Sequence, residues 1–161
     1  MADSSKAAFP DFEHSLPMLL LKAREAVMTR FRPMLREVGL TEQQWRVIRA
    51  LSEVGEHDAG ELAKVSYILS PSLTRILQRL ENRGLIQRRA DEADQRRTLI
   101  SLSDEGQKLF SMVRPLSSAI YAQIASELGS DRLTGLYNVL GEVEERLLTK
   151  AESMENEDSG D

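Results

Sequence analysis

The chain of 161 residues contains no cysteine, and it has only two histidines, five prolines and 5% aromatic side chains. Without cysteine it can form no disulfide, thiolate nucleophile or thiol redox sensor, and methionine alone offers a weak sulfur ligand to a metal. His14 and His57 lie far apart in the sequence and outside any ligand-spaced cluster. The sequence therefore indicates no metal site, and the lack of cysteine fits a reducing cytoplasm.

Motifs for catalysis and for membrane insertion are also missing. The sequence contains no glycine-rich phosphate loop and no pairing of a nucleophile with a base, so we expect neither a cofactor nor an enzyme. The first 15 residues mix charged side chains with little apolar content, unlike a secretory signal or a membrane span. We therefore expect a cytoplasmic protein of one domain, because this length can bury a core without cross-links.

The net charge of −5 is unevenly distributed along the chain. Residues 59–102 carry eight basic and five acidic side chains, whereas residues 142–161 carry eight acidic and two basic ones. A basic patch on an acidic body is typical of a protein that binds nucleic-acid phosphates. The alternative is an ordinary solvated surface, and charge alone does not choose between the two.

Capping-box sequences predict the start of two short helices. Thr41 is followed by Gln44, and Asp58 is followed by Glu61. In each pair the two side chains can satisfy N–H groups that a helix start leaves free. The apolar side chains expected to face inward from these helices are Trp45, Ile48, Leu51, Leu62 and Val65.

A third short helix is predicted between Ser70 and Gly84. Ser70 is a preferred N-cap residue, Pro71 suits the first helical position, and Gly84 suits the left-handed residue after a helix end. Residues 85–89 and 98–102 then have strand patterns, and the charged loop between them completes a hairpin. The predicted fold is mainly α with a small β-hairpin wing, a winged helix-turn-helix that spans residues 41–102.

This arrangement predicts contacts with double-stranded DNA. A helix fits the major groove, where Arg75 is the best candidate to read a base, and Arg79 is better placed for phosphate. Arginines in the loop can enter the minor groove, with Asp94 aiming Arg96 through an ion pair. The predicted DNA-binding residues are Ser70, Ser72, Thr74, Arg75, Gln78, Arg79, Asp94, Arg96 and Arg97. The alternatives are a solvated amphipathic helix and a charged turn that keeps an edge strand soluble.

Longer helices are predicted on both sides, within residues 15–38 and 103–150, and either Ser130 or Asp131 is expected to cap the last one. Its apolar residues repeat with alternating spacings of three and four, which is a heptad seam, so we expect this helix to pair with that of a second copy in a homodimer. The expected interface residues on this helix are Leu133, Leu136, Leu140, Val143 and Leu147.

The two ends of the chain contain few apolar residues that could anchor them. We expect residues 1–14 to form a flexible arm and residues 151–161 to form an acidic, disordered tail.

Several spaced motifs resemble the MarR family of transcription regulators. Residues 94–106 (DQRRTLISLSDEG) are similar to the family's wing and following helix start, and residues 72–75 (SLTR) and 80–86 (LENRGLI) are similar to its recognition helix. Within the family, the segments at 23–26 (AREA), 31–33 (FRP) and 40–46 (LTEQQWR) are most similar to repressors of homoprotocatechuate (4-hydroxyphenylacetate) degradation operons.

The resemblance implies a homodimer formed by the terminal helices, with Leu16 and Leu20 of the first helix also in the interface. It further implies a repressor that binds a pseudo-palindromic operator and is released by a small phenolic or aromatic carboxylate effector. The alternatives are a related regulator of an antibiotic or stress response, and a helical protein-interaction module with no DNA role.

Arg24 is the candidate for effector binding, because it lies on the apolar stripe of the predicted first helix. A charge at such a position needs a partner. One candidate partner is the carboxylate of an aromatic effector, with Trp45 as a wall of the site and His14 or Ser15 near its mouth. The other is a structural ion pair with a carboxylate of the same or the other subunit.

Overall fold

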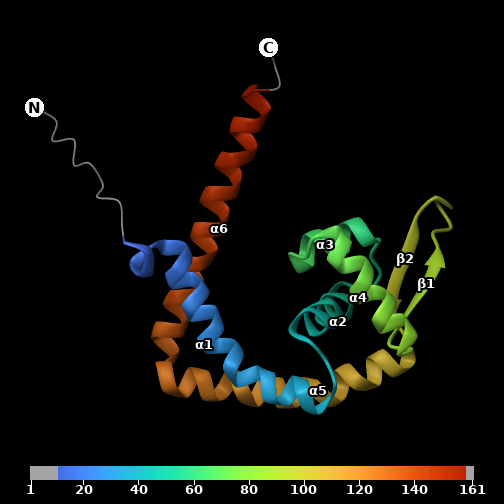
Figure 1. The fold of residues 1–161 in the computed structure, drawn as a ribbon, viewed down its shortest axis with the longest axis horizontal. Helices are drawn as coiled ribbons and strands as arrows, with labels where there is room; N and C mark the ends of the chain where they lie inside the picture. Colours follow the sequence, from blue (N-terminus) through green and yellow to red (C-terminus); the bar gives the residue numbers. More distant parts are fainter. Residues whose placement is uncertain (1–10, 159–161) are drawn as a thin grey trace, which may run out of the picture. The chain divides into compact units, whose positions relative to one another are not determined.

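The computed structural model describes the backbone of residues 11–158 and the side chains of residues 11–148. The chain divides into two compact units, one ending at Ser118 and the other beginning at Ala119, which are described separately. Helices dominate the described residues, and one two-stranded sheet lies in the first unit (Figure 1). The prediction of a mainly α fold with a small β-hairpin wing is confirmed.

The first unit contains most of the elements, and α5 continues into the second unit, which ends with α6. In order, the elements are η1 (Phe12–His14), α1 (Leu16–Glu37), α2 (Glu42–Val54), α3 (Ala59–Ser66), α4 (Ser70–Asn82), β1 (Ile86–Ala90), β2 (Thr98–Leu102), α5 (Asp104–Leu128) and α6 (Ser130–Asp158).

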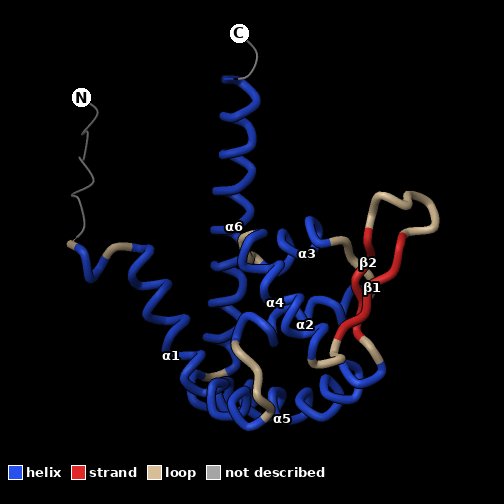
Figure 2. Tube along the Cα trace, turned by 45° about the vertical axis from the view of Figure 1, so that its right-hand side comes forward, coloured by secondary structure: helices blue, strands red, loops and turns tan. Residues whose placement is uncertain are grey.

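Three short helices and the hairpin share one apolar core in the first unit. Helices α2, α3 and α4 pack together, β2 contacts α2 and α3, and β1 contacts α4. In Figures 1 and 2 the two strands lie beside these helices, and the loop that joins β1 to β2 is at the outer end of the hairpin. The predicted stripe of α4 is buried, as are side chains from α2, α3 and β2: Val47, Ile48, Leu62, Leu73, Ile76, Leu77, Leu80 and Ile100. Each such side chain stabilises the folded unit by about 1.5–3 kcal/mol relative to an exposed one.

Both predicted capping boxes are present. Thr41 Oγ1 accepts from Gln44 N at 3.2 Å, and Gln44 Oε1 accepts from Thr41 N at 2.9 Å. At the start of α3, Asp58 Oδ1 accepts from Glu61 N at 2.8 Å, and Glu61 Oε2 accepts from Asp58 N at 3.3 Å. These bonds fix the first turns of α2 and α3, so the two helices begin where the sequence predicts.

Helix α4 begins one residue earlier than predicted. Leu69 occupies the N-cap position with no side-chain cap, and its carbonyl accepts from Leu73 N at 2.9 Å. Ser70 and Pro71 are therefore the first and second helical residues. Proline is tolerated at the first and second helical positions, because a helix makes no internal hydrogen bond to the N–H of either residue. The inward direction expected for Val65 is also wrong, since this side chain is 49% exposed.

The strands pair antiparallel, from Ile86 opposite Leu102 to Ala90 opposite Thr98. Strand β1 begins one residue later than predicted because the N–H of Leu85 bonds back to Leu80 O at 3.0 Å and closes the end of α4. Gly84, with φ of +68°, provides the left-handed turn that this ending requires.

Helix α6, in the second unit, differs from expectation at both ends. Its start is capped by Gly129, whose carbonyl accepts from Leu133 N at 3.1 Å, and not by Ser130 or Asp131. Gly129 has a φ of +85°, a backbone conformation that residues with a side chain rarely adopt. The helix runs to Asp158, past residue 151 where a disordered tail was predicted. Most residues of 151–158 are good helix formers, so the helix continues from the preceding turns.

At the other end of the chain, residues 12–14 form a 3₁₀ turn where a flexible arm was predicted, and Asp11 caps this turn. Residues 1–10 and 159–161, which complete the predicted arm and tail, lie outside the described residues.

Candidate nucleic-acid interface

The polar face of α4 is the first part of the candidate interface. Ser70, Ser72, Thr74, Arg75, Gln78 and Arg79 are all exposed. Thr74 Oγ1 donates to Ser70 O at 3.0 Å, and the Gln78 amide donates to Asn82 Oδ1 at 3.0 Å. Arg75 and Arg79 make no ion pair with any residue that the structure describes. The sequence reasoning thus placed two available guanidinium groups on one exposed face.

The turn between α3 and α4 holds the N-terminus of α4 in place. Ile68 in this turn is 5% exposed, and its N–H donates to Ala63 O at 3.1 Å. Tyr67 has a left-handed backbone with φ of +50°. Arg46 of α2 donates from Nη1 to Ser66 O at 3.1 Å. The turn is therefore tied to the core, to the end of α3 and to α2.

The loop end of the wing, just before β2 begins, is joined to the start of α3 by Arg97, which the sequence predicted to bind DNA. Arg97 donates to Asp58 Oδ2 from Nη2 at 2.5 Å and from Nε at 3.0 Å, and it lies 3.2 Å from Glu61 Oε1. The backbone N–H of Glu61 and the Arg97 guanidinium lower the pKa of Asp58. In this geometry Arg97 anchors the wing, and entry into the minor groove, as predicted, would require the contact with Asp58 to open. That β2 packs against α3 was not visible in the sequence.

At the tip of the wing, Asp94 acts on the backbone. Its carboxylate accepts from Arg96 N at 3.0 Å, and its carbonyl accepts from Arg97 N at 2.8 Å. The predicted ion pair between the Asp94 and Arg96 side chains is absent, because the carboxylate is used to close the turn. Among the described residues Arg96 has no ion-pair partner, so of the two loop arginines it is the one available to a phosphate.

Two further arginines, on β1, are paired with carboxylates of the same unit. Arg89 makes a two-bond contact with Glu56, in which Nε lies 2.8 Å from Oε1. Arg88 Nε donates to Glu81 Oε2 at 3.1 Å. The guanidinium of Arg89 lowers the pKa of Glu56. Sequence reasoning missed these pairs, because each joins residues that lie seven or more positions apart.

Arg24, the candidate effector anchor, belongs to a ring of two arginines and two glutamates. It donates to Glu25 Oε1 at 2.8 Å and to Glu42 Oε2 at 2.7 Å. Arg32 contacts the same two carboxylates, at 2.5 Å and 2.6 Å. Partial burial alone would raise the pKa of Glu42, but the hydrogen bonds from Arg32 and Arg24 lower it overall. These contacts make Arg24 part of a structural ion pair, the alternative that the sequence left open. The Arg24 side chain is 42% exposed.

The other effector candidates are not assembled around Arg24. Trp45 is 7% exposed and stacks on Phe110 with ring centroids 5.8 Å apart, a contact that sequence reasoning missed. His14 and Ser15 bond instead to residues of η1 and its cap. No described contact links His14 or Ser15 with Arg24 or Trp45.

The predicted dimer residues leave much apolar surface uncovered on the chain. Leu16 and Leu20 are 54% and 39% exposed on α1. On α6, Leu133 and Val143 are partly buried, and the others are exposed by 38% or more: Leu136, Leu140 and Leu147.

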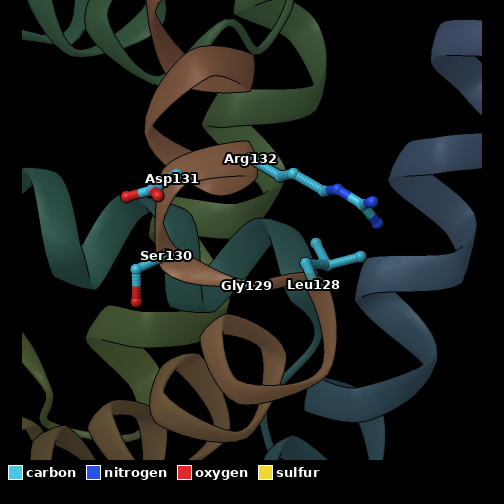
Figure 3. A pocket seen from close by; sticks show the side chains of 5 residues that line it. All are labelled: Leu128, Gly129, Ser130, Asp131 and Arg132. Carbon is cyan, nitrogen blue, oxygen red and sulfur yellow. The ribbon is translucent and has the colours of Figure 1, made fainter.

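The turn between α5 and α6 has an open depression of about 390 Å³, lined by Leu128, Gly129, Ser130, Asp131 and Arg132. Figure 3 shows that Asp131 and Arg132 point in opposite directions, so these side chains do not converge on a ligand. Within the described residues there is no group of three or more potential metal-ligating side chains, and no helix is long and apolar enough to cross a membrane.

Comparison with known proteins supports the resemblance seen in the sequence. The model of the MarR family matches residues 40–98, which include α2, α3, α4 and β1. Over 129 residues the chain is 43% identical to the HTH-type transcriptional regulator FarR of Neisseria gonorrhoeae, covering 80% of this chain and 88% of FarR. This chain belongs to the MarR family of transcriptional regulators.

Two other known proteins are similarly related to this chain. The homoprotocatechuate degradative operon repressor of Escherichia coli is 42% identical over 128 residues, covering 80% of this chain and 86% of the repressor. The structure of NadR in complex with 4-hydroxyphenylacetate has 38% identity and a TM-score of 0.76, covering 84% of this chain and 98% of NadR. Regulators of the MarR family bind DNA as dimers. Of these two properties, the exposed face of α4 indicates the binding of DNA.

Proposed function

We propose that this chain is a cytoplasmic, homodimeric repressor that binds a pseudo-palindromic operator through α4 and the wing. The observation that carries the proposal is the exposed face of α4, where Arg75 and Arg79 have no ion-pair partner among the described residues. Below this face the apolar stripe of α4 is buried, so the helix is held rigidly. At the wing tip Arg96 is likewise available to a phosphate.

The proposed dimer rests on the heptad seam of α6. An exposed leucine stripe on a small protein is costly in water, and pairing with a second copy would cover it. In a two-fold dimer the two α4 helices would read equivalent half-sites about one helical turn of DNA apart. That geometry requires an operator with pseudo-palindromic sequence.

We further propose that a small phenolic or aromatic carboxylate releases the operator. Two relatives support this ligand class, one named for the homoprotocatechuate operon and one bound to 4-hydroxyphenylacetate. In this chain Arg24 already binds Glu25 and Glu42, so an effector carboxylate at Arg24 would have to displace one of them. A bidentate carboxylate suits the planar guanidinium for such an exchange.

The test of DNA binding starts from a pool of duplexes with a randomised centre, from which the wild-type dimer enriches its preferred sequence. Arg75→Ala should relax the base preference at one symmetric pair of positions, by about 1–3 kcal/mol of discrimination. Arg79→Ala should weaken binding to all duplexes alike and reduce the salt dependence of binding. If wild type enriches no sequence, or binds random duplex without any salt dependence, the proposal is wrong and a protein-interaction role is favoured.

A further inference from the structure

Leu69 occupies the N-cap position of α4, and the stability of the fold does not explain why a leucine lies there. It is 80% exposed, more than any other large apolar side chain that the structure describes. Leucine is also a poor N-cap, because it cannot accept from the free N–H groups at the helix start. Serine, threonine, asparagine or aspartate would stabilise this helix start better.

The position of this leucine is well defined. Its neighbour Ile68 is buried, Arg46 donates to Ser66 O in the same turn, and the Leu69 carbonyl accepts from Leu73 N. Single exposed apolar side chains are common on protein surfaces, so exposure alone assigns no role to Leu69. Here the backbone on both sides is held, so the point from which the isobutyl group projects into solvent is fixed.

The polar and basic residues that follow Leu69 on α4 indicate which partner would cover its side chain. Leu69 directly precedes the exposed residues Ser70 and Ser72 of the first turn of α4, and Arg75 and Arg79 follow on that helix. The N-terminal residues of a recognition helix are those that reach base edges. An apolar side chain beside such residues has one partner in the major groove, the 5-methyl group of thymine.

We infer that Leu69 reads the methyl group of a thymine next to the base contacted by the first turns of α4. The inference rests on the proposed function, since it requires α4 to lie in the major groove. It adds a specificity-determining residue whose contact is apolar, and it accounts for a leucine at a position where a polar cap would stabilise the helix.

Replacing thymine by deoxyuridine removes only this methyl group, so it provides the sharpest test. The probe is the duplex that wild type enriches from the randomised pool, remade with one symmetric pair of thymines at a time changed to deoxyuridine. At one such pair, wild type should lose about fourfold in affinity for each half-site, the value of one buried methyl group. Leu69→Ala should bind the original and the substituted duplex equally at that pair.

Leu69→Ser is the second variant, because serine is a preferred N-cap and should keep the helix start at least as stable as in wild type. It should show the same insensitivity to deoxyuridine, with a melting temperature no lower than that of wild type. Val54→Ala is the matched control, since Val54 is 60% exposed at the end of α2 and should leave the deoxyuridine penalty unchanged.

Two results would overturn the inference while leaving the proposed function intact. One is a deoxyuridine penalty of the same size in wild type and both Leu69 variants at every position. The other is a loss of dimer mass in sedimentation for both Leu69 variants, which would assign the leucine to a contact with a second copy. If wild type itself enriches no sequence, the proposed function fails and the inference fails with it.

Discussion

Gly106 connects the first turn of α5 to the wing, and replacing it by alanine should destabilise the first unit. A Cβ at this position would lie 2.0 Å from Leu85 O, 3.0 Å from Leu85 C and 3.3 Å from Leu102 Cδ2. Leu85 directly precedes β1, and Leu102 ends β2. The added methyl group would therefore push against the point where both strands of the wing join the helices.

The size of the effect follows from two opposing contributions. In an open helical position alanine is more stable than glycine by about 1 kcal/mol. At Gly106 the nearest atom is a backbone oxygen, and Cβ atoms essentially never approach other atoms closer than 3.0 Å, so the backbone must separate by about 1 Å. Overpacking of this kind costs about 1–3 kcal/mol, and more where the neighbour is backbone. The Leu85 carbonyl also accepts from Ser103 N at 3.2 Å, a bond that such a shift would weaken.

Thermal melts at fixed protein concentration would measure this effect. We expect Gly106→Ala to lower the melting temperature by about 4–8 °C, because the upper end of the overpacking cost less the alanine gain is about 2 kcal/mol and 1 kcal/mol corresponds to about 2–4 °C for a chain of this size. Gly141→Ala is the matched control, because a Cβ there meets nothing within 4 Å and Gly141 lies off the heptad seam. The control should melt at or slightly above wild type. A Gly106→Ala protein that melts at or above wild type would refute the reasoning.

Three further perturbations test the wing anchor, the dimer and the effector site. Because the folded-state pKa of Asp58 is lowered, its ionised form stabilises the fold above the ordinary value of 3.8, and this stabilisation is lost as pH falls through the lowered pKa. Asp58→Asn should thus destabilise the protein equally from about pH 5 to 8 and by less below about pH 4, as judged by urea melts; a constant difference would exclude the pair with Arg97. Leu140→Glu places a charge in the heptad seam and should shift the sedimenting species to monomer at micromolar concentration. Arg24→Lys should keep operator binding and raise the concentration of 4-hydroxyphenylacetate needed for release if Arg24 binds the effector; an unchanged midpoint with a lowered melting temperature would leave only the structural ion pair.

Features that depend on near neighbours in the chain were predictable from the sequence. The capping box at Thr41 and the one at Asp58 each need only a partner three residues on, and both are formed. Gly84 adopts the left-handed backbone that ends α4. The buried stripe of α4 follows from helical periodicity alone. Local signals of this kind placed the starts of α2, α3 and α4 within a residue of those observed.

Features that depend on distant neighbours were not predictable. Arg97 is adjacent to Arg96 in a loop whose composition is typical of DNA contacts, yet it reaches Asp58, which lies 39 positions earlier. Arg24 lies on the stripe that helical spacing marks as apolar, but Glu42 of the next helix neutralises it at a partly exposed site. In both cases the carboxylate partner is brought close by packing between elements, which the spacing of residues does not encode. The burial of Trp45 was expected from the sequence. Its stacking on Phe110 was not, because Phe110 belongs to the distant helix α5.

The paired arginines change how the basic excess of residues 59–102 should be understood. Arg88, Arg89 and Arg97 are each bound to carboxylates of the same unit, and Arg83 donates to the carbonyl oxygens of Val38 and Gly39. A guanidinium held by a carboxylate can neutralise a phosphate only if that pair opens, which removes part of the gain. The charges of these paired arginines therefore hold the hairpin in place and contribute less to the attraction of DNA. The available arginines of residues 59–102 are left on α4 and at the wing tip, which are the two places that would enter the grooves.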